Sequence, residues 1–341
     1  MSTVPASIEQ LPPRRMVADD VETRIPLAPG DLVLVEAGAV VEPGDALVDR
    51  LLDPRVDEAP VPTEDGAPAP AAGSRRVTGR ATGGRRRGRD PEGELLMPIP
   101  ASRDGWRIVV GDHRETITAP TGGTVVSIQA GGEVRLRARG RFLRGAFAAG
   151  TPARGRLQLA VDPFGELRPD GIDVGRAGSI LVVGSRIDAE ALTRARAMGV
   201  RGIVVASLAG KEQRDFVASE RRQQAAFHPA PPFGVLVLDG ALRRPIASPV
   251  AALLERLAGR EVAILTDPPG LVFDDPEVEL PEIPADWVRV RHGPSLGAEG
   301  RFIGLVGLRR FAAGVHLEAA RVAIEGEPPV DLPLADLERL A

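Results

Sequence analysis

The middle of the chain alternates short apolar runs with longer segments of helical periodicity. The apolar runs are rich in Val, Ile and Leu, and glycine or proline borders most of them. The predicted strands are 179–184, 201–207, 233–240 and 261–267, and the predicted helices between them are 187–199, 211–227 and 248–259. Strands and helices that alternate at this spacing predict a small parallel-sheet α/β domain at 161–270.

Two segments nearer the N-terminus consist instead of short β-branched runs. Residues 24–50 contain several such runs, separated by turns with glycine and proline. The sequence TITAPTGGTVVSI at 116–128 predicts a pair of strands that turns at 121–123. We therefore expect a β-rich domain formed by 1–51 and 99–160.

Two other stretches lack these patterns. Residues 52–98 are rich in Pro, Ala and Gly, with acids first and arginines after them, so they are predicted to be a disordered insertion. The Pro-rich, acidic stretch from Asp267 to Pro284 is predicted to be a connector into a last β-rich unit at 285–341. The fold class that follows is multidomain α+β.

The N-terminal β segments resemble the halves of a barrel-sandwich hybrid, the fold of biotinyl and lipoyl carriers. The resemblance rests on VEAGAVVEPGDAL at 35–47 and on APTGGTVVSI at 119–128. Carriers of that family attach their cofactor to a lysine on a tight turn, and these segments contain no lysine. The resemblance thus implies the fold without covalent biotin or lipoate, and we expect no cofactor.

The C-terminal unit is similar to a KOW-type small barrel, as found in transcription elongation factors and ribosomal proteins. The sequence WVRVRHGPSLGAEGRFIGLVG at 287–307 has two strands around a glycine-rich turn, and 320–326 and 330–340 match closing strands. The resemblance implies that the turn approaches RNA or protein. Leu296 and Ala298 stand where many relatives carry basic residues, which favours a protein partner. The turn residues are Gly293, Pro294, Gly297 and Gly300.

Arginine is the one residue type with a marked pattern. All but one of the 43 basic residues are arginines, the exception being Lys211. A strand at 134–142 (VRLRARGRF) is predicted to carry one arginine face, formed by Arg135, Arg137, Arg139 and Arg141. A second group lies in the predicted insertion: Arg75, Arg76, Arg80, Arg85, Arg86, Arg87 and Arg89. Both groups are candidates for binding nucleic acid or an acidic partner. Alternatively, the insertion stays solvated and the strand arginines protect a sheet edge.

The loops after the predicted strands of the α/β domain are candidates for binding a small anion. The candidate residues are Gly184, Ser185, Asp188, Ser207 and Lys211, with 239–240 after the third strand. An ordinary helix cap explains Ser185 and Asp188 equally well. Gly210 and Lys211 do not form a P-loop, since Val205 and Glu212 occupy its other required positions.

Catalytic and metal-binding motifs are missing from the sequence. There is no cysteine, tyrosine or G-x-S-x-G motif, and the four histidines have no metal-ligand spacing. Asp267, Asp274 and Asp275 are close in sequence and are compatible with a cation site, although a solvated connector is the commoner use of such acids. We therefore expect neither a catalytic residue nor a metal.

The overall composition limits the partners. With 43 basic and 47 acidic residues the net charge is −4, so the chain is not a polycation. Neither a secretory signal nor an apolar stretch of membrane-spanning length is present, so we expect a cytoplasmic protein without a membrane partner.

These observations favour a non-enzymatic, multidomain binding or scaffold protein. It would dock onto a protein complex of the transcription or translation machinery, and its arginines would add affinity for nucleic acid. The alternative is a protein that binds a small anionic ligand, or an enzyme, with the central α/β domain as the active part.

Overall fold

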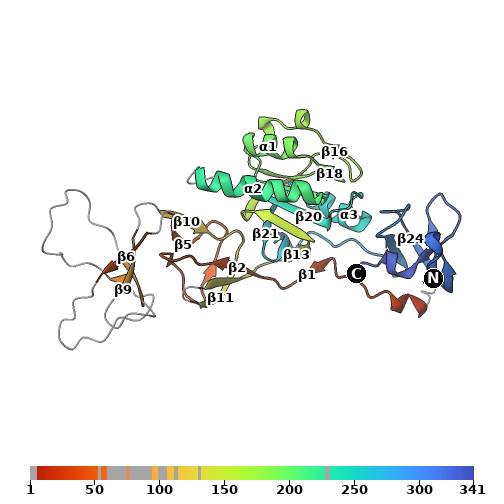
Figure 1. Cartoon of the computed structure of the whole chain (residues 1–341), viewed down its shortest axis with the longest axis horizontal. Coiled ribbons are helices and arrows are strands. Elements are labelled where there is room, and N and C mark those ends of the chain that lie inside the picture. Colours follow the sequence, from red (N-terminus) through yellow and green to blue (C-terminus); the bar gives the residue numbers. More distant parts are fainter. Residues whose placement is uncertain are drawn as a thin grey trace, which may run out of the picture. The chain divides into compact units, whose positions relative to one another are not determined.

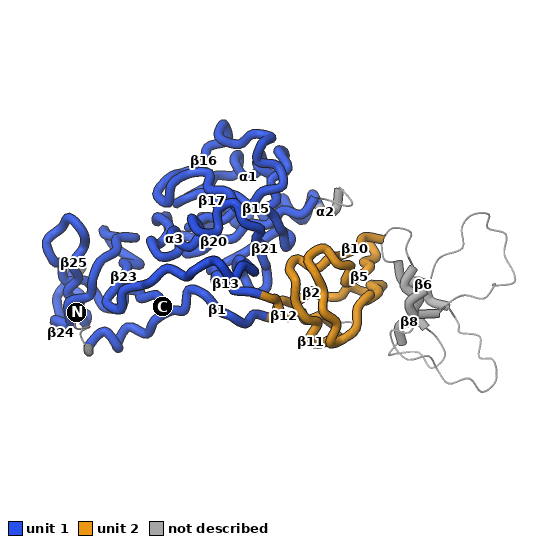
Figure 2. Tube along the Cα trace, turned by 180° about the vertical axis from the view of Figure 1, so that it is seen from behind, with its two compact units in different colours: residues 1–21, 140–341 blue, residues 22–139 orange. Residues whose placement is uncertain are grey.

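The computed structural model describes residues 6–52, 114–129, 132–226 and 231–341, together with the backbone of four short strands between 55 and 110. The chain divides into two compact units, formed by 1–21 with 140–341 (unit 1) and by 22–139 (unit 2) (Figure 2). The described residues contain several β-sheets and three α-helices, which confirms a mixed α and β composition.

Unit 2 contains two small antiparallel sheets around one hydrophobic core. One sheet has the order β10-β5-β3 and the other β2-β12-β11-β4. The strands are β2 (Glu22–Pro26), β3 (Leu32–Val33), β4 (Val40–Val41), β5 (Ala46–Leu51), β10 (Arg114–Thr118), β11 (Gly123–Gln129) and β12 (Glu133–Ala138). Buried Leu47, Val125 and Leu136 are central to this core.

The prediction that the strands on either side of 121–123 pair with each other is wrong. Strand β10 pairs with β5, whereas β11 pairs with β12 and β4 in the other sheet. The chain changes sheets at this point because Ala119 turns into the core and Gly123 lies tightly against β12. A Cβ on Gly123 would lie 2.0 Å from the carbonyl oxygen of Arg137.

Four backbone strands lie within or beside the predicted disordered insertion. They form an antiparallel sheet of order β6-β9-β8-β7. The strands are β6 (Arg55–Ala59), β7 (Arg75–Arg76), β8 (Glu94–Pro98) and β9 (Trp106–Val110). Strands β6, β7 and β8 differ from the predicted disorder, and β8 pairs with β9, where the sequence predicts order, so that Leu96 lies opposite Ile108. The rest of 53–113 lies outside the described residues, and the disorder predicted for the remainder of 53–98 stays a prediction.

Unit 1 is built around an eleven-stranded sheet whose centre is parallel. Its central strands are β15 (Ala153–Leu159), β17 (Ser179–Val182), β19 (Gly202–Ser207) and β20 (Gly234–Gly240). The outer strands are β1 (Val17–Ala18), β13 (Arg141–Arg144), β14 (Phe147–Gly150), β16 (Glu166–Leu167), β18 (Arg186–Ile187), β21 (Glu261–Thr266) and β22 (Pro269–Phe273). The helices are α1 (Ala189–Ala197), α2 (Gly210–Ala226) and α3 (Ser248–Arg256). The predicted α/β alternation is thus confirmed.

The helices cover opposite faces of this sheet (Figure 1). Side chains of α1 and α2 pack into one core, and those of α3 pack into the other. Along β17, Ile180 faces the α3 core and Leu181 the other, so both faces are buried and the strand reads as a continuous apolar run.

The sheet is mixed rather than purely parallel, and part of the predicted connector belongs to it. Strand β15 is antiparallel to β21, and β22 lies between β21 and β13. Strand β22 falls within the stretch predicted to be a connector, 267–284. It forms because Leu271, Val272 and Phe273 are a fully apolar run, and the prolines before it leave that run intact. Pro269 stands at the first strand position, where proline is tolerated.

The C-terminal part of unit 1 is a five-stranded antiparallel sheet of order β26-β25-β24-β23-β27. The strands are β23 (Trp287–Val290), β24 (Glu299–Arg310), β25 (His316–Ile324), β26 (Val330–Pro333) and β27 (Leu337–Glu338). Strands β24 and β25 are longer than the strands beside them. Strand β23 pairs with β24 only at 299–301, and β26 pairs with β25 only at 319–322. The distal β24–β25 hairpin is therefore a two-stranded ribbon.

The N-terminal segment packs on this C-terminal sheet. Ile8, in the short helix η1 (Ala6–Gln10), and Leu11 join the core of that sheet. Arg14 then forms a parallel bridge with Leu340, and the Met16 N–H donates to the carbonyl of Ala341. The sequence analysis placed these residues in an N-terminal domain at 1–51. It did so because η1 has no strand or helix pattern long enough to indicate a remote partner.

The predicted arginine strand at 134–142 is two strands. Strand β12 ends at Ala138, and β13 begins at Arg141 in unit 1. Gly140 separates them with φ +101°, and a Cβ there would lie 2.4 Å from the carbonyl oxygen of Phe273. The strict alternation of the sequence continues across this glycine, so periodicity alone does not detect the break.

Alanine at Gly140 tests how strictly this left-handed turn is required. Gly259 has φ +81° with open space around it, so Gly259→Ala carries only backbone strain of about 1–2 kcal/mol. Gly140→Ala adds the collision with Phe273, and we expect the free energy of unfolding to fall by about 3 kcal/mol or more. Urea denaturation measures both; equal losses would mean that the contact with Phe273 imposes no constraint.

Candidate functional site

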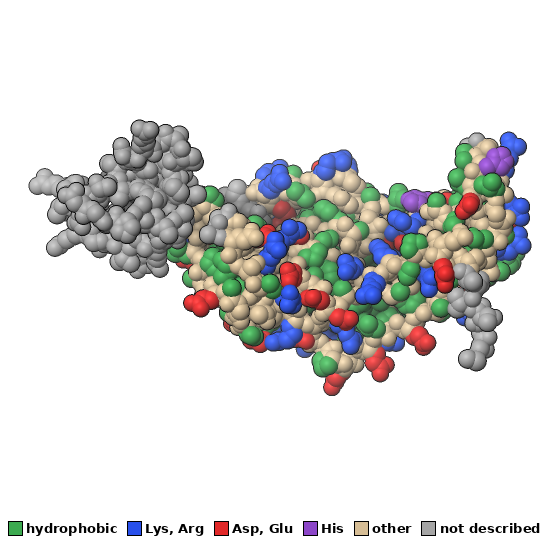
Figure 3. All heavy atoms as spheres, turned by 90° about the horizontal axis from the view of Figure 1, so that it is seen from below, with side chains coloured by type: hydrophobic (Ala, Val, Ile, Leu, Met, Phe, Trp, Pro, Cys, Tyr) green, Lys and Arg blue, Asp and Glu red, His purple; other side chains and the backbone are tan. Residues whose placement is uncertain are grey.

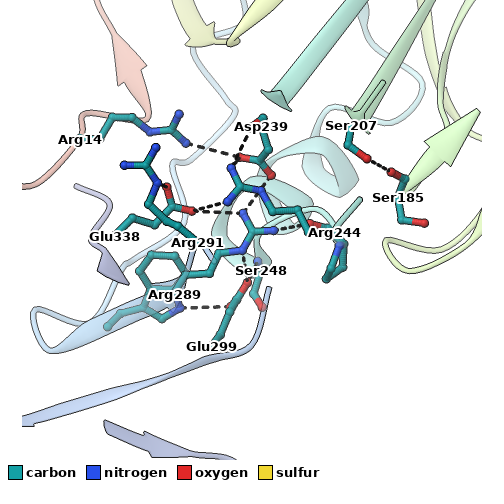
Figure 4. Close-up of polar contacts among 12 residues, drawn as sticks. Arg14, Ser185, Ser207, Asp239, Arg244, Ser248, Arg289, Arg291, Glu299 and Glu338 are labelled. Carbon is teal, nitrogen blue, oxygen red and sulfur yellow. Dashed lines mark hydrogen bonds and ion pairs between the residues drawn. The ribbon is translucent and has the colours of Figure 1, made fainter. Parts of the chain in front are cut away.

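A buried arginine of the C-terminal sheet reaches into the end of the α/β sheet (Figure 4). Arg289, on β23, has no exposed surface. Its Nη1 donates to Oδ2 of Asp239 at 2.9 Å, and its Nη2 donates to the carbonyl of Pro245. Asp239 lies near the carboxyl end of β20, so this contact joins the two sheets of unit 1.

Further charges surround this pair. Arg244 lies 3.3 Å from Asp239 and 3.6 Å from Glu338, and Glu338 lies 3.5 Å from Arg289. Burial lowers the pKa of Arg244, against the opposing effects of Asp239 and Glu338. Two more exposed arginines lie beside these residues. Arg14 is 3.6 Å from Asp239, and Arg291 is 3.9 Å from Glu338. We call these six residues the junction cluster: Arg14, Asp239, Arg244, Arg289, Arg291 and Glu338.

A second contact fixes the base of the hairpin. Glu299, the first residue of β24, accepts hydrogen bonds from the Ser248 N–H at 2.8 Å and from the Trp287 indole at 3.2 Å. The first N–H groups of a helix have no partner within the helix, so this carboxylate caps α3 from the C-terminal sheet.

Two glycines of the predicted KOW-like turn pack against other parts of unit 1. Gly297 has φ +85°, and a Cβ there would lie 2.8 Å from Cδ of Pro245, so this glycine lets the turn approach the α/β sheet. Gly300 packs against β25, where a Cβ would lie 2.2 Å from the carbonyl oxygen of Ala323. Gly293 and Pro294 are exposed.

A cavity of about 600 Å³ adjoins the junction cluster. Four arginines and three carboxylates line it, together with several leucines. The charged lining residues are Arg14, Asp239, Arg244, Arg291, Glu318, Glu338 and Arg339. With guanidinium groups in excess, the cavity suits an anion better than a cation.

The predicted anion-binding loops lie together at the carboxyl ends of the parallel strands, but their polar atoms serve the fold. The Ser185 hydroxyl donates to the carbonyls of Phe164 and Gly165, both at 3.0 Å. The Ser207 hydroxyl donates to the Ser185 carbonyl at 2.6 Å. Asp188 caps α1 by accepting the Ala191 N–H.

The remaining two residues of the predicted loops are Gly184 and Lys211. Gly184 is held against the loop before β16, because a Cβ would lie 2.4 Å from the carbonyl oxygen of Gly165. Lys211 is exposed in the first turn of α2.

The arginines of β12 and the following turn are paired with acids of their own unit. Arg135 contacts Glu133 at 2.5 Å, and Arg137 contacts Glu22 at 2.7 Å. Arg139 makes two hydrogen bonds to Glu42, which lower the pKa of that carboxyl. Arg141, in unit 1, donates to the Val278 carbonyl at 2.7 Å. These residues therefore do not form one continuous basic face.

Contacts of the second arginine group, between 75 and 89, lie outside what the structure describes. Arg75 and Arg76 lie in β7, whose side chains are not described. The other members, Arg80, Arg85, Arg86, Arg87 and Arg89, lie outside the described residues.

The acidic residues considered as a cation site have partners in the protein. Asp275 pairs with Arg260 and accepts the Glu277 N–H. Asp267 and Asp274 also have polar interactions. Within the ranges that the structure describes, no group of His, Asp and Glu side chains could hold a metal ion.

Sequence reasoning missed most of the junction cluster. Asp239 was found as a loop residue after a predicted strand, but Arg289 follows the alternation of an ordinary half-exposed strand. No sequence signal marks it, since only the structure shows that β23 is buried throughout.

Neither a protein-family model nor a curated protein matches this chain. Among the described residues, no helix combines the length and apolarity needed to cross a membrane.

Removal of the Asp239 charge tests whether the junction cluster stabilises unit 1. Asp239→Asn leaves the buried Arg289 and Arg244 without their shared carboxylate, and we expect the free energy of unfolding to fall by about 3–5 kcal/mol. The control, Glu261→Gln, removes a surface pair with Arg154 and should cost less than about 1 kcal/mol. Similar urea unfolding curves for the two variants would contradict this role.

Proposed function

We propose that the chain is a non-enzymatic binding protein that docks onto a larger protein assembly through its β24–β25 hairpin. The observation that carries the proposal is a set of exposed apolar side chains on this hairpin and its turn. The exposed fraction is 68% for Leu308, 49% for Val315, 46% for Ile303 and 38% for Leu317. Exposed apolar side chains that gather on one element are typical of protein interaction sites.

The hairpin combines these apolar side chains with positive charge. Leu308 and Arg310 are two residues apart and share one face of the ribbon. On the other face, Arg309 pairs directly across from Leu317. Figure 3 includes this end of unit 1, where basic, histidine and hydrophobic side chains lie close together at the right.

Strands β24 and β25 carry four arginines and two glutamates, an excess of positive charge that favours an acidic partner. Arg309 and Arg321 share a single carboxylate, Asp331, whose pKa the Arg321 hydrogen bonds lower. Arg310 has no ion pair among the described residues. The partner that fits is a protein surface with an apolar centre and acidic residues around it.

The architecture of both units supports the two resemblances. The five antiparallel strands around Phe302 and Val322 suit a KOW-like small barrel. The two sheets of unit 2 around one core suit a barrel-sandwich hybrid without a carrier lysine. Modules of these types in one chain favour an assembly component of transcription or translation. Because Arg289 and Glu299 fix the base of the hairpin, it would meet the partner as a preformed element.

Leu308→Asp is the sharpest test of the hairpin. The side chain is mostly exposed, so the variant should fold normally and lose the contact with the partner. We expect proteins captured by the tagged chain from nuclease-treated host lysate to fall at least about tenfold. Val174→Asp, at a position 75% exposed in the α/β part, is the matched control and should leave capture unchanged. Undiminished capture with Leu308→Asp would refute docking through the hairpin.

The arginines between 75 and 89 are proposed to add nucleic-acid affinity. Seven arginines without an intervening acid neutralise phosphates independently of sequence, so affinity should fall steeply with salt. Deletion of 72–92 should lower the affinity for single-stranded RNA and flatten its dependence on salt concentration. Replacement of 72–92 by a shuffled sequence with the same arginines should preserve both. An unchanged salt slope after deletion would remove this role.

A further inference from the structure

The cavity beside the junction cluster is lined by Leu317 and Glu318 of β25 and by arginines from three separate segments. Arg14 precedes β1, Arg291 follows β23, and Arg339 follows β27. We propose that this cavity binds a small molecule that carries a phosphate group on an apolar body.

The protein does not saturate these guanidinium groups. The short hydrogen bonds from the junction cluster belong to Arg289 and Arg244. Arg14 and Arg291 reach their carboxylates only at 3.6 and 3.9 Å, beyond hydrogen-bond distance. Arg339 has no hydrogen bond or ion pair from its side chain within the described part of the chain. Donors therefore remain for an added acceptor.

The balance of charge favours an anion. Asp239 and Glu338 together face four guanidinium groups, those of Arg14, Arg244, Arg289 and Arg291. Glu318, on β25, is the one further carboxylate of the lining, and Arg339 is one further cation. With Arg289 and its neighbour Glu299 counted behind the wall, five arginines face four carboxylates, so a bound anion would reduce the repulsion among the arginines.

The shape and the remaining lining indicate the rest of the ligand. A volume of about 600 Å³ is in the usual range of small-molecule sites and exceeds what one phosphate fills. The apolar part of the wall includes Leu11, Leu317 and Leu337, whereas no aromatic side chain lines the cavity to stack a nucleobase. Three guanidinium groups from different directions suit the several oxygens of a phosphate better than the single plane of a carboxylate.

Calorimetric titration of the full chain with phenyl phosphate, at fixed ionic strength, tests the proposal. We expect one binding site, and weaker binding of inorganic phosphate and of benzoate. Arg339→Ala and Arg291→Ala should each raise Kd at least about tenfold. Both side chains are partly exposed, so the unliganded melting temperatures should stay close to that of the unchanged chain. Arg154→Ala, a surface arginine paired with Glu261, is the matched control and should not alter Kd.

Three results would overturn the proposal. Absence of phenyl phosphate binding would mean that the protein's own carboxylates satisfy the arginines. Equal Kd values for the unchanged chain and Arg339→Ala would place any bound phosphate elsewhere. Binding of a short oligonucleotide without binding of phenyl phosphate would assign the arginines to a nucleic-acid backbone instead. Leu308 is not among the lining residues of the cavity, so the capture experiment and the phosphate titration can fail separately.

Discussion

The buried contact between Arg289 and Asp239 is the interaction on which the arrangement of unit 1 depends. A guanidinium group without solvent exposure loses its hydration, which costs several kcal/mol unless hydrogen bonds replace it. Asp239 and the Pro245 carbonyl supply these bonds from the α/β part, and Arg289 comes from the C-terminal sheet. Separation of the two sheets would therefore leave Arg289 and Asp239 unpaired. The cost of these unpaired charges opposes separation of the sheets.

This single junction also explains the position of the two proposed binding surfaces. Glu299 caps α3 at the start of β24, so the hairpin leaves the junction from a fixed base. The cavity adjoins the same cluster, and Arg14 and Arg339 in its wall are held close together by the bridge between the N-terminal segment and Leu340. A ligand in the cavity would add acceptors to the cluster and so stabilise the same junction that supports the hairpin.

The sequence predicts the local strands and helices well, but it does not predict the contacts between residues that are far apart in the chain. The strands and helices of the α/β part were predictable because their apolar runs and periodicities are properties of neighbouring residues. The break at Gly140 and the strand β22 were not, because each depends on a close approach to a remote strand. Arg289 was missed for the same reason. Its partner lies 50 residues away, and nothing in WVRV distinguishes a buried arginine from an exposed one.

The near-complete use of arginine in place of lysine gives these contacts a common physical basis. A guanidinium group has five donors in a planar fork, so one Arg289 can join a carboxylate and a carbonyl where a lysine would present a point charge. In unit 2, Arg137 and Arg139 each form an ion pair with a glutamate, so their charges are neutralised within the protein. Among the described residues, Arg310 and Arg339 have no acidic partner of this kind. Because a guanidinium group is charged at any physiological pH, these two side chains are available to solvent or to a partner.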